Sequence, residues 1–355
     1  MKKIIPLILA TPAAFAFEGF YAQYDDWDIA CDNTGTCRAA GYHSDETPLD
    51  AEGYPEPVSL LFTRDAGAEA GVTAQLQIIP VDNNGQYVDT RATLTLNGET
   101  LGEFTFPADN AVQTLDDKQT AALLAALPVE KAEIVVTAGE RKMPLSALGA
   151  AAALLKMDDF QGRLDTPSAL VKKGNDTKAV PEAVAKPQIK IVIPPQDAPR
   201  ELAADSPEAL ALMQLFDKDF NGEQFACVAR DEGNAFTLYP LGQGRVLSET
   251  NCWTAAYNGT MHYAIVSDDL KTVIAKIRGS WAGEEDFGLN DYAPADGKLT
   301  GYFKGRGLGD CWSTETWAYD GERFVQTSDA EHGQCKGFPG GAWEMPTLVT
   351  ETVKP

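Results

Sequence analysis

Hydrophobic and polar residues alternate in short runs along most of the first half of the chain. The runs Trp27–Cys31, Val58–Arg64 and Val72–Ile79 are each bounded by turn residues. A further alternating stretch, Thr93–Phe106, is interrupted at Asn97-Gly98, a dipeptide favoured in two-residue hairpin turns. This period of two predicts β-strands with mostly antiparallel pairing.

Two helices are predicted after this β region. Asp116 with Gln119 three residues later forms a capping-box pattern, which predicts a helix over residues 117–127. Ser146 is expected to cap a second helix. The expected buried face of that second helix consists of Leu148, Ala151, Ala152 and Leu155.

The second half begins with a third helix pattern and continues as strands and turns. Ser206-Pro207-Glu208 is a helix start with proline at the first position, and apolar spacing continues to Phe216. The sequence therefore predicts an α+β fold that is predominantly antiparallel β.

The segment 173–204 separates the two halves and contains five prolines. Proline at this density resists regular structure and favours an extended spacer. Because the chain is also too long for one core, we expect two β-rich domains. The expected boundaries are an N-terminal α+β domain at 17–172, a Pro-rich linker at 173–204, and a disulfide-stapled β-rich domain at 205–355.

The N-terminus has the pattern of a secretory signal peptide. Lys2 and Lys3 precede an apolar run from Ile4 to Ala10, and Ala14-Phe15-Ala16 supplies small residues at a cleavage position. The apolar run is shorter than the ~20 residues that cross a bilayer. We therefore expect residues 1–16 to be removed and the mature protein to be periplasmic, without membrane insertion.

Six cysteines are present, and no Cys-x-x-Cys pair occurs among them. An even number in an exported chain favours disulfides over zinc ligation. Spacing along the chain favours pairs between neighbours, although six cysteines allow 15 connectivities. The favoured pairs are Cys31–Cys37, Cys227–Cys252 and Cys311–Cys335. The first is expected to pin the first strand, which carries Trp27 and Ile29.

The chain carries a formal charge of −23, which becomes −25 once Lys2 and Lys3 are removed with the signal peptide. Nucleic-acid binding needs a basic surface, so it is excluded as a general function. A strongly acidic surface favours encounter with cationic partners, but it also serves solubility alone.

Residues that could catalyse a reaction are scarce in the sequence. Only three histidines occur, and no nucleophile elbow, zinc-protease helix or P-loop is found. Two carboxylates suffice for glycoside hydrolysis, so an acid-pair hydrolase stays open as an alternative. Nothing in the sequence selects two of the 52 acidic residues, so no catalytic residue is assigned.

The pattern Asp217-x-Asp219-x-Asn221-Gly222 matches the first six positions of a calcium-binding loop. The twelfth position should be a bidentate glutamate and is Val228. The same residues fit a simple Asn-Gly turn that leaves a helix. Calcium at Asp217, Asp219 and Asn221 is the only cofactor that the sequence suggests.

A second candidate site lies in the sequence KGRGLGDCW, residues 304–312. Lys304 and Arg306 alternate with glycines, whose N–H groups can converge on an anion. Trp312, Trp317 and Tyr319 could add an aromatic binding face. The alternative is a glycine turn entering a strand, with the aromatic residues in the core.

The chain resembles the bacterial envelope family known as domain of unknown function 1176. The resemblance rests on the opening DW-x-x-x-CDNTG-x-C-x-A-x-GY, on SLLFTRDAG at 59–67, and on GRGLGDC with the later W-x-Y-D-G-x-x-F and C-x-G motifs. The first half also resembles the invasion-associated locus B family. The resemblance implies export, disulfides and two domains, and it assigns no catalytic residue.

These observations favour a non-enzymatic periplasmic protein that binds a partner in the cell envelope. The sharpest form of this hypothesis is an acidic inhibitor of a basic hydrolase such as lysozyme. A calcium-dependent glycan-binding module and an acid-pair hydrolase are the alternatives. The partner is expected to be an envelope protein or glycan, and a cationic protein would suit the charge of the chain.

Overall fold

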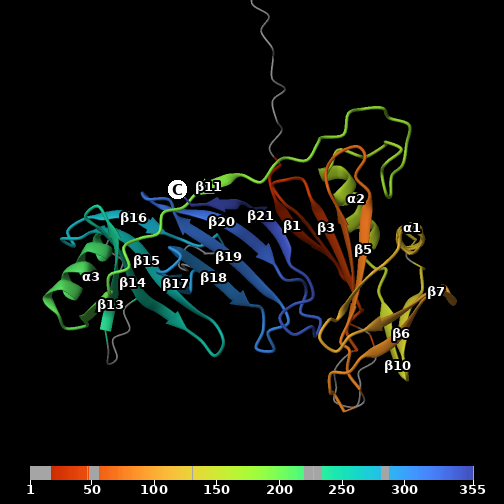
Figure 1. Cartoon of the computed structure of the whole chain (residues 1–355), viewed down its shortest axis with the longest axis horizontal. Coiled ribbons are helices and arrows are strands. Elements are labelled where there is room, and N and C mark those ends of the chain that lie inside the picture. Colours follow the sequence, from red (N-terminus) through yellow and green to blue (C-terminus); the bar gives the residue numbers. More distant parts are fainter. Residues whose placement is uncertain are drawn as a thin grey trace, which may run out of the picture.

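The structure is a computed structural model, and it describes residues 17–45, 47, 56–82, 84–129, 131–219, 227, 234–280 and 288–354. Within these ranges the chain is mostly antiparallel β-sheet with three helices (Figure 1). The predicted fold class is confirmed in this respect. The domain boundaries at residues 172 and 204 stay a prediction.

Two sheets form the N-terminal half. The six-stranded sheet has the order β1-β2-β3-β4-β5-β8, and the four-stranded sheet has the order β10-β9-β6-β7. The strands of the first are β1 (Phe20–Tyr24), β2 (Trp27–Cys31), β3 (Cys37–Tyr42), β4 (Val58–Arg64), β5 (Val72–Ile78) and β8 (Val112–Thr114). Those of the second are β6 (Thr90–Leu96), β7 (Glu99–Phe106), β9 (Ile134–Ala138) and β10 (Arg141–Leu145).

Every residue of β2 is buried, because both faces of the six-stranded sheet are covered. Trp27 and Ile29 point into the main core of the N-terminal half, together with the four-stranded sheet and α2. Ala30 points the other way and packs against Phe338 and Trp343 from the C-terminal half. The two halves therefore share an apolar interface, and Asp28 lies on the same side of β2 as Ala30.

The first helix, α1 (Asp117–Ala126), begins as predicted. Asp116 accepts a hydrogen bond from the Gln119 backbone, and the Gln119 side chain accepts one from the Asp116 backbone. This reciprocal capping satisfies two of the N–H groups that a helix start leaves unpaired.

The predicted buried face of the second helix is wrong. α2 (Ala150–Phe160) begins after Gly149, whose φ of 90° suits glycine, and Ser146 accepts from the Leu148 amide in the preceding turn. Leu148 and Leu155 are exposed. Because the helix begins later than the Ser146 cap implied, the side chains that face the core are Ala150, Ala153, Leu154 and Met157.

Two five-stranded sheets and one helix, α3 (Pro207–Asp219), form the C-terminal half. One sheet contains β12 (Arg200–Ala203), β13 (Asn234–Gly242), β14 (Arg245–Thr254), β15 (Gly259–Ser267) and β16 (Val273–Ile277). The other contains β17 (Asp291–Ala293), β18 (Lys298–Lys304), β19 (Trp312–Tyr319), β20 (Phe324–Glu331) and β21 (Met345–Val349). Both follow chain order and are antiparallel, and α3 lies in the connection between β12 and β13.

The segment 173–204 follows the surface of both halves along one edge of the molecule (Figure 1). In the N-terminal half, the Pro181 carbonyl accepts from Gly67 and the Val184 amide donates to Thr34. Further along, β11 (Gln188–Lys190) pairs in parallel with β22 (Glu351–Val353). Backbone hydrogen bonds thus attach this segment to each half.

Three disulfides join Cys31–Cys37, Cys227–Cys252 and Cys311–Cys335, the pairs that spacing along the chain favoured. The first joins the end of β2 to the start of β3, at a pair of directly opposed residues in the core. It holds the strand that carries Trp27 and Ile29, as expected, although β1 precedes this strand and forms the edge of the sheet. Three disulfides fit an extracytoplasmic location.

Among the helices in the described ranges, none combines the length and the apolar character that crossing a bilayer requires.

Candidate functional site

The connection between β18 and β19, residues 304–312, is here called the glycine loop. Its ends are joined by a hydrogen bond from the Gly305 amide to the Cys311 carbonyl, and the Gly309 amide donates to the Arg306 carbonyl. Gly309 has a φ of 69°, a conformation that side-chain-bearing residues rarely adopt. The glycines therefore serve to form a tight turn with a fixed backbone, and they do not make the loop flexible.

An ion pair inside the glycine loop fixes its shape. The Arg306 guanidinium donates through both Nε (2.7 Å) and Nη2 to the two carboxylate oxygens of Asp310, which is fully buried. The Gly337 amide also donates to Asp310 Oδ2 at 2.6 Å. Burial raises the pKa of Asp310, but these hydrogen bonds outweigh it and hold the pKa below its usual value.

Residues 333–341, here called the clamp, hold the glycine loop from outside. The Cys311–Cys335 disulfide joins the two segments covalently. Arg306 Nη2 donates to the Cys335 carbonyl at 3.0 Å, and the Gly340 amide donates to the Gly309 carbonyl at 2.9 Å. Arg306 thus serves as a structural brace, which leaves less of its guanidinium free for an external anion.

Large apolar side chains are exposed around this rigid loop. Leu308 at its tip is 58% exposed, Tyr257 is 45% exposed and Tyr302 is 39% exposed. Tyr257 comes from the turn between β14 and β15 and lies close to Gly307. That turn is tied to the loop because Asn258 exchanges two hydrogen bonds with the Lys304 backbone.

Lys304 and Trp312 face each other across the β18–β19 pair. The Lys304 ammonium lies 4.8 Å from the Trp312 ring centroid, within the range of a cation–π interaction. The Trp312 indole donates a hydrogen bond to the Gly309 carbonyl. The ring centroids of Tyr302 and Trp312 lie 6.1 Å apart, on the same face of the sheet. We call this group the loop surface; it comprises Tyr257, Tyr302, Lys304, Leu308 and Trp312.

Two residues of the sequence-based site lie elsewhere. Trp317 is on the opposite face of the sheet, where its Nε1 donates to Glu315 Oε2 at 2.9 Å. Tyr319 is buried in the core between the two C-terminal sheets, and its hydroxyl donates to the Gly321 carbonyl. The structure therefore brings together Lys304, Arg306 and Trp312 but not Trp317 or Tyr319.

No residue pattern marked Tyr257, Tyr302 or Leu308 in the sequence. Leu308 could have been noticed as an isolated apolar residue within a polar glycine turn. Tyr257 and Tyr302 belong to different sheets, and contacts between the sheets, such as the two hydrogen bonds between Asn258 and Lys304, bring their neighbourhoods together.

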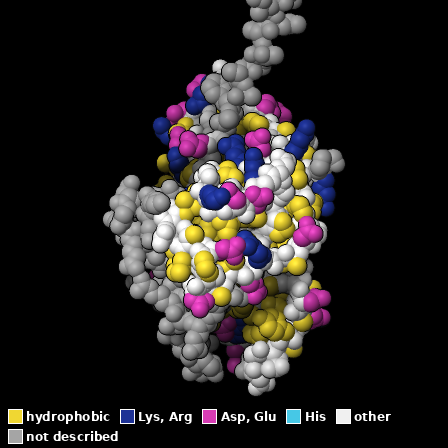
Figure 2. All heavy atoms as spheres, turned by 90° about the vertical axis from the view of Figure 1, so that its left-hand side faces the viewer, with side chains coloured by type: hydrophobic (Ala, Val, Ile, Leu, Met, Phe, Trp, Pro, Cys, Tyr) yellow, Lys and Arg dark blue, Asp and Glu magenta, His cyan; other side chains and the backbone are white. Residues whose placement is uncertain are grey.

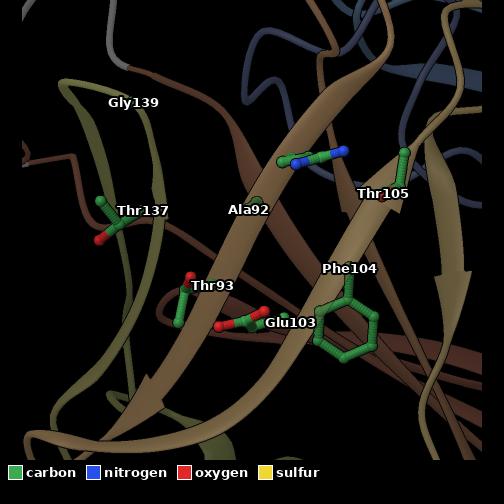
Figure 3. A pocket seen from close by; sticks show the side chains of 8 residues that line it. Ala92, Thr93, Glu103, Phe104, Thr105, Thr137 and Gly139 are labelled. Atoms are coloured by element: carbon green, nitrogen blue, oxygen red, sulfur yellow. The ribbon is translucent and has the colours of Figure 1, made fainter.

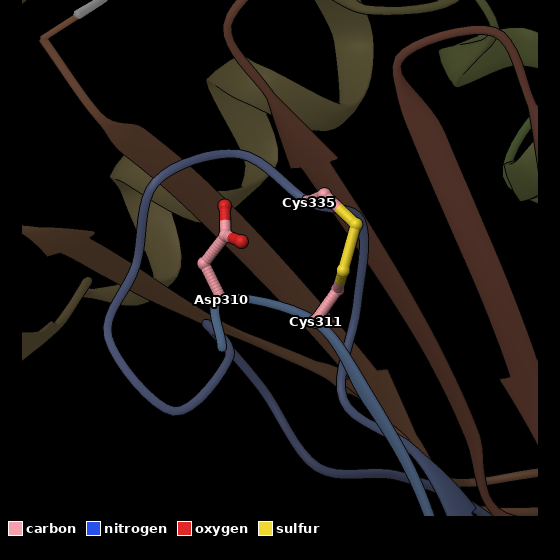
Figure 4. A group of neighbouring side chains, drawn as sticks. All are labelled: Asp310, Cys311 and Cys335. Carbon is pink, nitrogen blue, oxygen red and sulfur yellow. A yellow bond between two sulfur atoms is a disulfide. The ribbon is translucent and has the colours of Figure 1, made fainter. Parts of the chain in front are cut away.

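One group of potential metal ligands lies at the end of the glycine loop. Asp310, Cys311 and Cys335 bring a carboxylate and two sulfur atoms within 4.8 Å of one another (Figure 4). The two sulfurs are bonded to each other, so neither is a thiolate that could ligate zinc. The proposed calcium ligands lie outside what the structure describes, because Asn221 and the side chains of Asp217 and Asp219 are not among the described positions.

A shallow concavity of about 620 Å³ lies over the outer face of the four-stranded sheet (Figure 3). Its lining is mostly polar: Arg91, Thr93, Glu103, Thr105 and Thr137 are among the residues that surround it. The side chains of Thr93 and Glu103 lie beside one another in this view. The concavity contains no residue of the loop surface.

Each of the three histidines has a lowered pKa. His43 and His262 are buried, and burial is the first cause that lowers their pKa values, to about 4 and about 3. Burial also lowers the pKa of His332, whose ring nitrogen lies 2.9 Å from the Thr314 hydroxyl. All three are therefore neutral near pH 7.

Acidic and basic side chains are mixed on the end of the molecule that carries α3. Figure 2 shows magenta and blue side chains interspersed among hydrophobic ones on this face. Although the chain has a net charge of −23, its acidic side chains do not form a single acidic patch on this face.

A known protein family matches nearly the whole chain. Residues 21–350 match the family model described as "Protein of unknown function (DUF1176)". The chain belongs to this family. The resemblance drawn from the sequence motifs is thus confirmed.

One relative from this comparison is the "Uncharacterized protein YpfG" of Escherichia coli (strain K12). It is 25% identical over 357 residues, which cover 96% of this chain and 94% of that protein. No solved structure matches the chain. Since the family has no described function, the loop surface has to be interpreted from its own chemistry.

Proposed function

We propose that this protein is an exported, non-enzymatic binding protein that holds a partner of the cell envelope at the loop surface. The observation that supports this most is the combination of exposed Leu308 and Tyr257 with a backbone that is held by an ion pair and a disulfide. Exposed apolar groups on a rigid support lose little conformational entropy on binding. Aromatic residues are also enriched where proteins bind each other.

The partner is a protein or glycan of the envelope. Tyr302 and Leu308 supply apolar contact area, and Lys304 supplies a cation at the rim. The inhibitor of a basic hydrolase remains the most specific version, supported by the overall acidity of the chain. The neutral, largely buried histidines favour a binding role over catalysis.

The test is affinity capture from an envelope extract with matched variants. Tyr257→Ala and Leu308→Ala alter the loop surface, whereas Tyr87→Ala and Val129→Ala remove equally exposed side chains from the N-terminal half. We expect the first pair to reduce recovery of a specific partner at least tenfold and the second pair to leave it unchanged. Equal recovery with all four variants would place the contact elsewhere.

A further inference from the structure

Polar side chains are buried where β2 meets the C-terminal half. Asp28 is fully buried, and its Oδ1 accepts a hydrogen bond from Gln334 Nε2 at 2.9 Å. Its Oδ2 has no hydrogen-bond partner among the described residues. Tyr21 and Tyr42, from the strands on either side of β2, lie beside this carboxylate.

A second carboxylate belongs to the same cluster. Glu331, at the end of β20, accepts from the Ser313 hydroxyl at 2.8 Å. Desolvation raises its pKa to about 7, and the charges of Asp329 and Asp28 add to this. Desolvation also raises the pKa of Asp28 to about 6, although Gln334, the two tyrosines and Lys336 act in the opposite direction.

Other charged groups also face this cluster. Lys336 Nζ donates to Asp26 Oδ1 (3.0 Å), to Asp45 Oδ1 (2.6 Å) and to the His43 carbonyl. The hydrogen bond from Lys336 lowers the pKa of Asp45, while burial lowers that of His43 and raises those of Tyr21 and Tyr42. Asp28 and Glu331 are the carboxylates of this cluster whose raised pKa values lie between pH 5 and 8. His332, which follows Glu331, has a pKa that burial lowers, so it gains its proton only on the acid side.

The same short segment contacts both this cluster and the glycine loop. Gln334 and Lys336 reach toward Asp28 and its neighbours, while Cys335 between them accepts from Arg306. Gly337 is the next residue, and its amide donates to Asp310. Movement of the clamp away from β2 would therefore loosen the contacts that shape the loop.

We propose that the buried carboxylate of Asp28 and the half-buried carboxylate of Glu331 form a pH-sensitive latch, which docks the clamp firmly in acid and less firmly at neutral pH. This inference rests on the proposed function, since it describes how the loop surface of that function is regulated. The latch is a local equilibrium of residues 333–341, because Ala342, Trp343 and Met345, which lie outside the clamp, keep the two halves together through their apolar contacts.

The direction follows from the burial of the two carboxylates. When the clamp detaches, water reaches them and their pKa values return toward the ordinary 3.8 and 4.5. Their contribution to docking is therefore complete below about pH 4 and is lost as pH rises through about 6 and about 7. A shift of about two units per group corresponds to up to ~100-fold in the docking equilibrium for each carboxylate.

Hydrogen exchange of the full mature chain, measured at pH 5 and pH 8 and corrected for the intrinsic exchange rate, tests the latch. The amides of Gly337 and Gly340 report on the clamp because both donate to the glycine loop. In the wild type we expect protection to fall by ~10- to 100-fold between pH 5 and 8. Asp28→Asn and Glu331→Gln, which mimic the protonated acids, should each retain more protection at pH 8. Glu103→Gln, on an exposed sheet face, should match the wild type.

Protection that does not change with pH in the wild type would overturn the latch. So would an equal pH dependence in Asp28→Asn and Glu331→Gln, and should one variant not fold, the other gives the same comparison. The measurement uses no partner, so its failure is separate from failure of the capture experiment. A latch without partner binding at the loop surface would contradict the proposed function alone.

Discussion

Replacing Asp310 with alanine removes the carboxylate that fixes the glycine loop. Its oxygens accept two hydrogen bonds from Arg306 and one, at 2.6 Å, from the Gly337 amide. Arg306 is half exposed, so water can replace its lost partner, and that contact contributes ~0.2–1 kcal/mol. The Gly337 amide is partly buried, and leaving it unpaired costs ~1–3 kcal/mol. Together we expect Asp310→Ala to lower the free energy of unfolding by ~1–4 kcal/mol.

A matched control is provided by the pair Arg200–Glu208. Arg200 is as exposed as Arg306, at 49% each, but Glu208 is 54% exposed whereas Asp310 is fully buried. Glu208→Ala should therefore cost no more than ~1 kcal/mol. Asp310→Asn, which keeps one acceptor oxygen, should fall between the two.

Urea denaturation followed by circular dichroism measures these differences in the free energy of unfolding. Hydrogen exchange over residues 304–312 then separates local loosening of the loop from global destabilisation. If Asp310→Ala and Glu208→Ala had equal effects, the buried carboxylate would not be a brace, and the argument for a rigid loop surface would fail.

Three further predictions concern the linker, calcium and charge. Trypsin under native conditions should cut first after Lys178, which is exposed just before the attachment points at Pro181 and Val184; a first cut inside either half would contradict the linker. Calorimetry should show calcium binding with a dissociation constant no lower than ~10⁻⁴–10⁻³ M. Equal heats of binding for Asp219→Ala and the wild type would contradict a calcium site at this loop. Association with a basic lysozyme should weaken between 0.1 M and 1 M salt, where the Debye length falls from ~10 to ~3 Å, and inhibition at a ratio of one to one would support an inhibitor. No association at low salt would exclude this partner.

Local patterns were sufficient to predict most strands of the N-terminal half. Trp27–Cys31 and Val58–Arg64 have the bounds of β2 and β4, and the Asn97-Gly98 turn joins β6 to β7. These elements are determined by neighbouring residues, through alternation, turn chemistry and capping. What covers the second face of the six-stranded sheet depends on residues some three hundred positions away, which no local pattern contains.

The sequence placed Lys304, Arg306 and Trp312 correctly in one site but wrongly added Trp317 and Tyr319, and the geometry of a strand explains the error. Side chains alternate along β19, so Trp317 and Tyr319, five and seven positions after Trp312, must face the other side of the sheet. The alternation of side chains along a strand could therefore have shown, from the sequence alone, that Trp312 lies on one face of the sheet and the other two aromatic residues on the opposite face. The contribution of Tyr257 could not be predicted in this way, because it depends on how two separate sheets meet.

The glycine loop is a costly element to order unless its order serves a purpose. Glycine loses more conformational freedom on folding than any other residue, and each fixed backbone residue costs ~1–2 kcal/mol. The Arg306–Asp310 pair and the Cys311–Cys335 disulfide offset that cost, yet the side chain they hold at the tip, Leu308, remains in water and gains nothing from it. Stability of the fold alone does not account for this arrangement, because a shorter polar turn could join β18 to β19. The proposed binding of a partner would account for it, since an apolar side chain that is already ordered keeps more of its contact energy when a partner covers it.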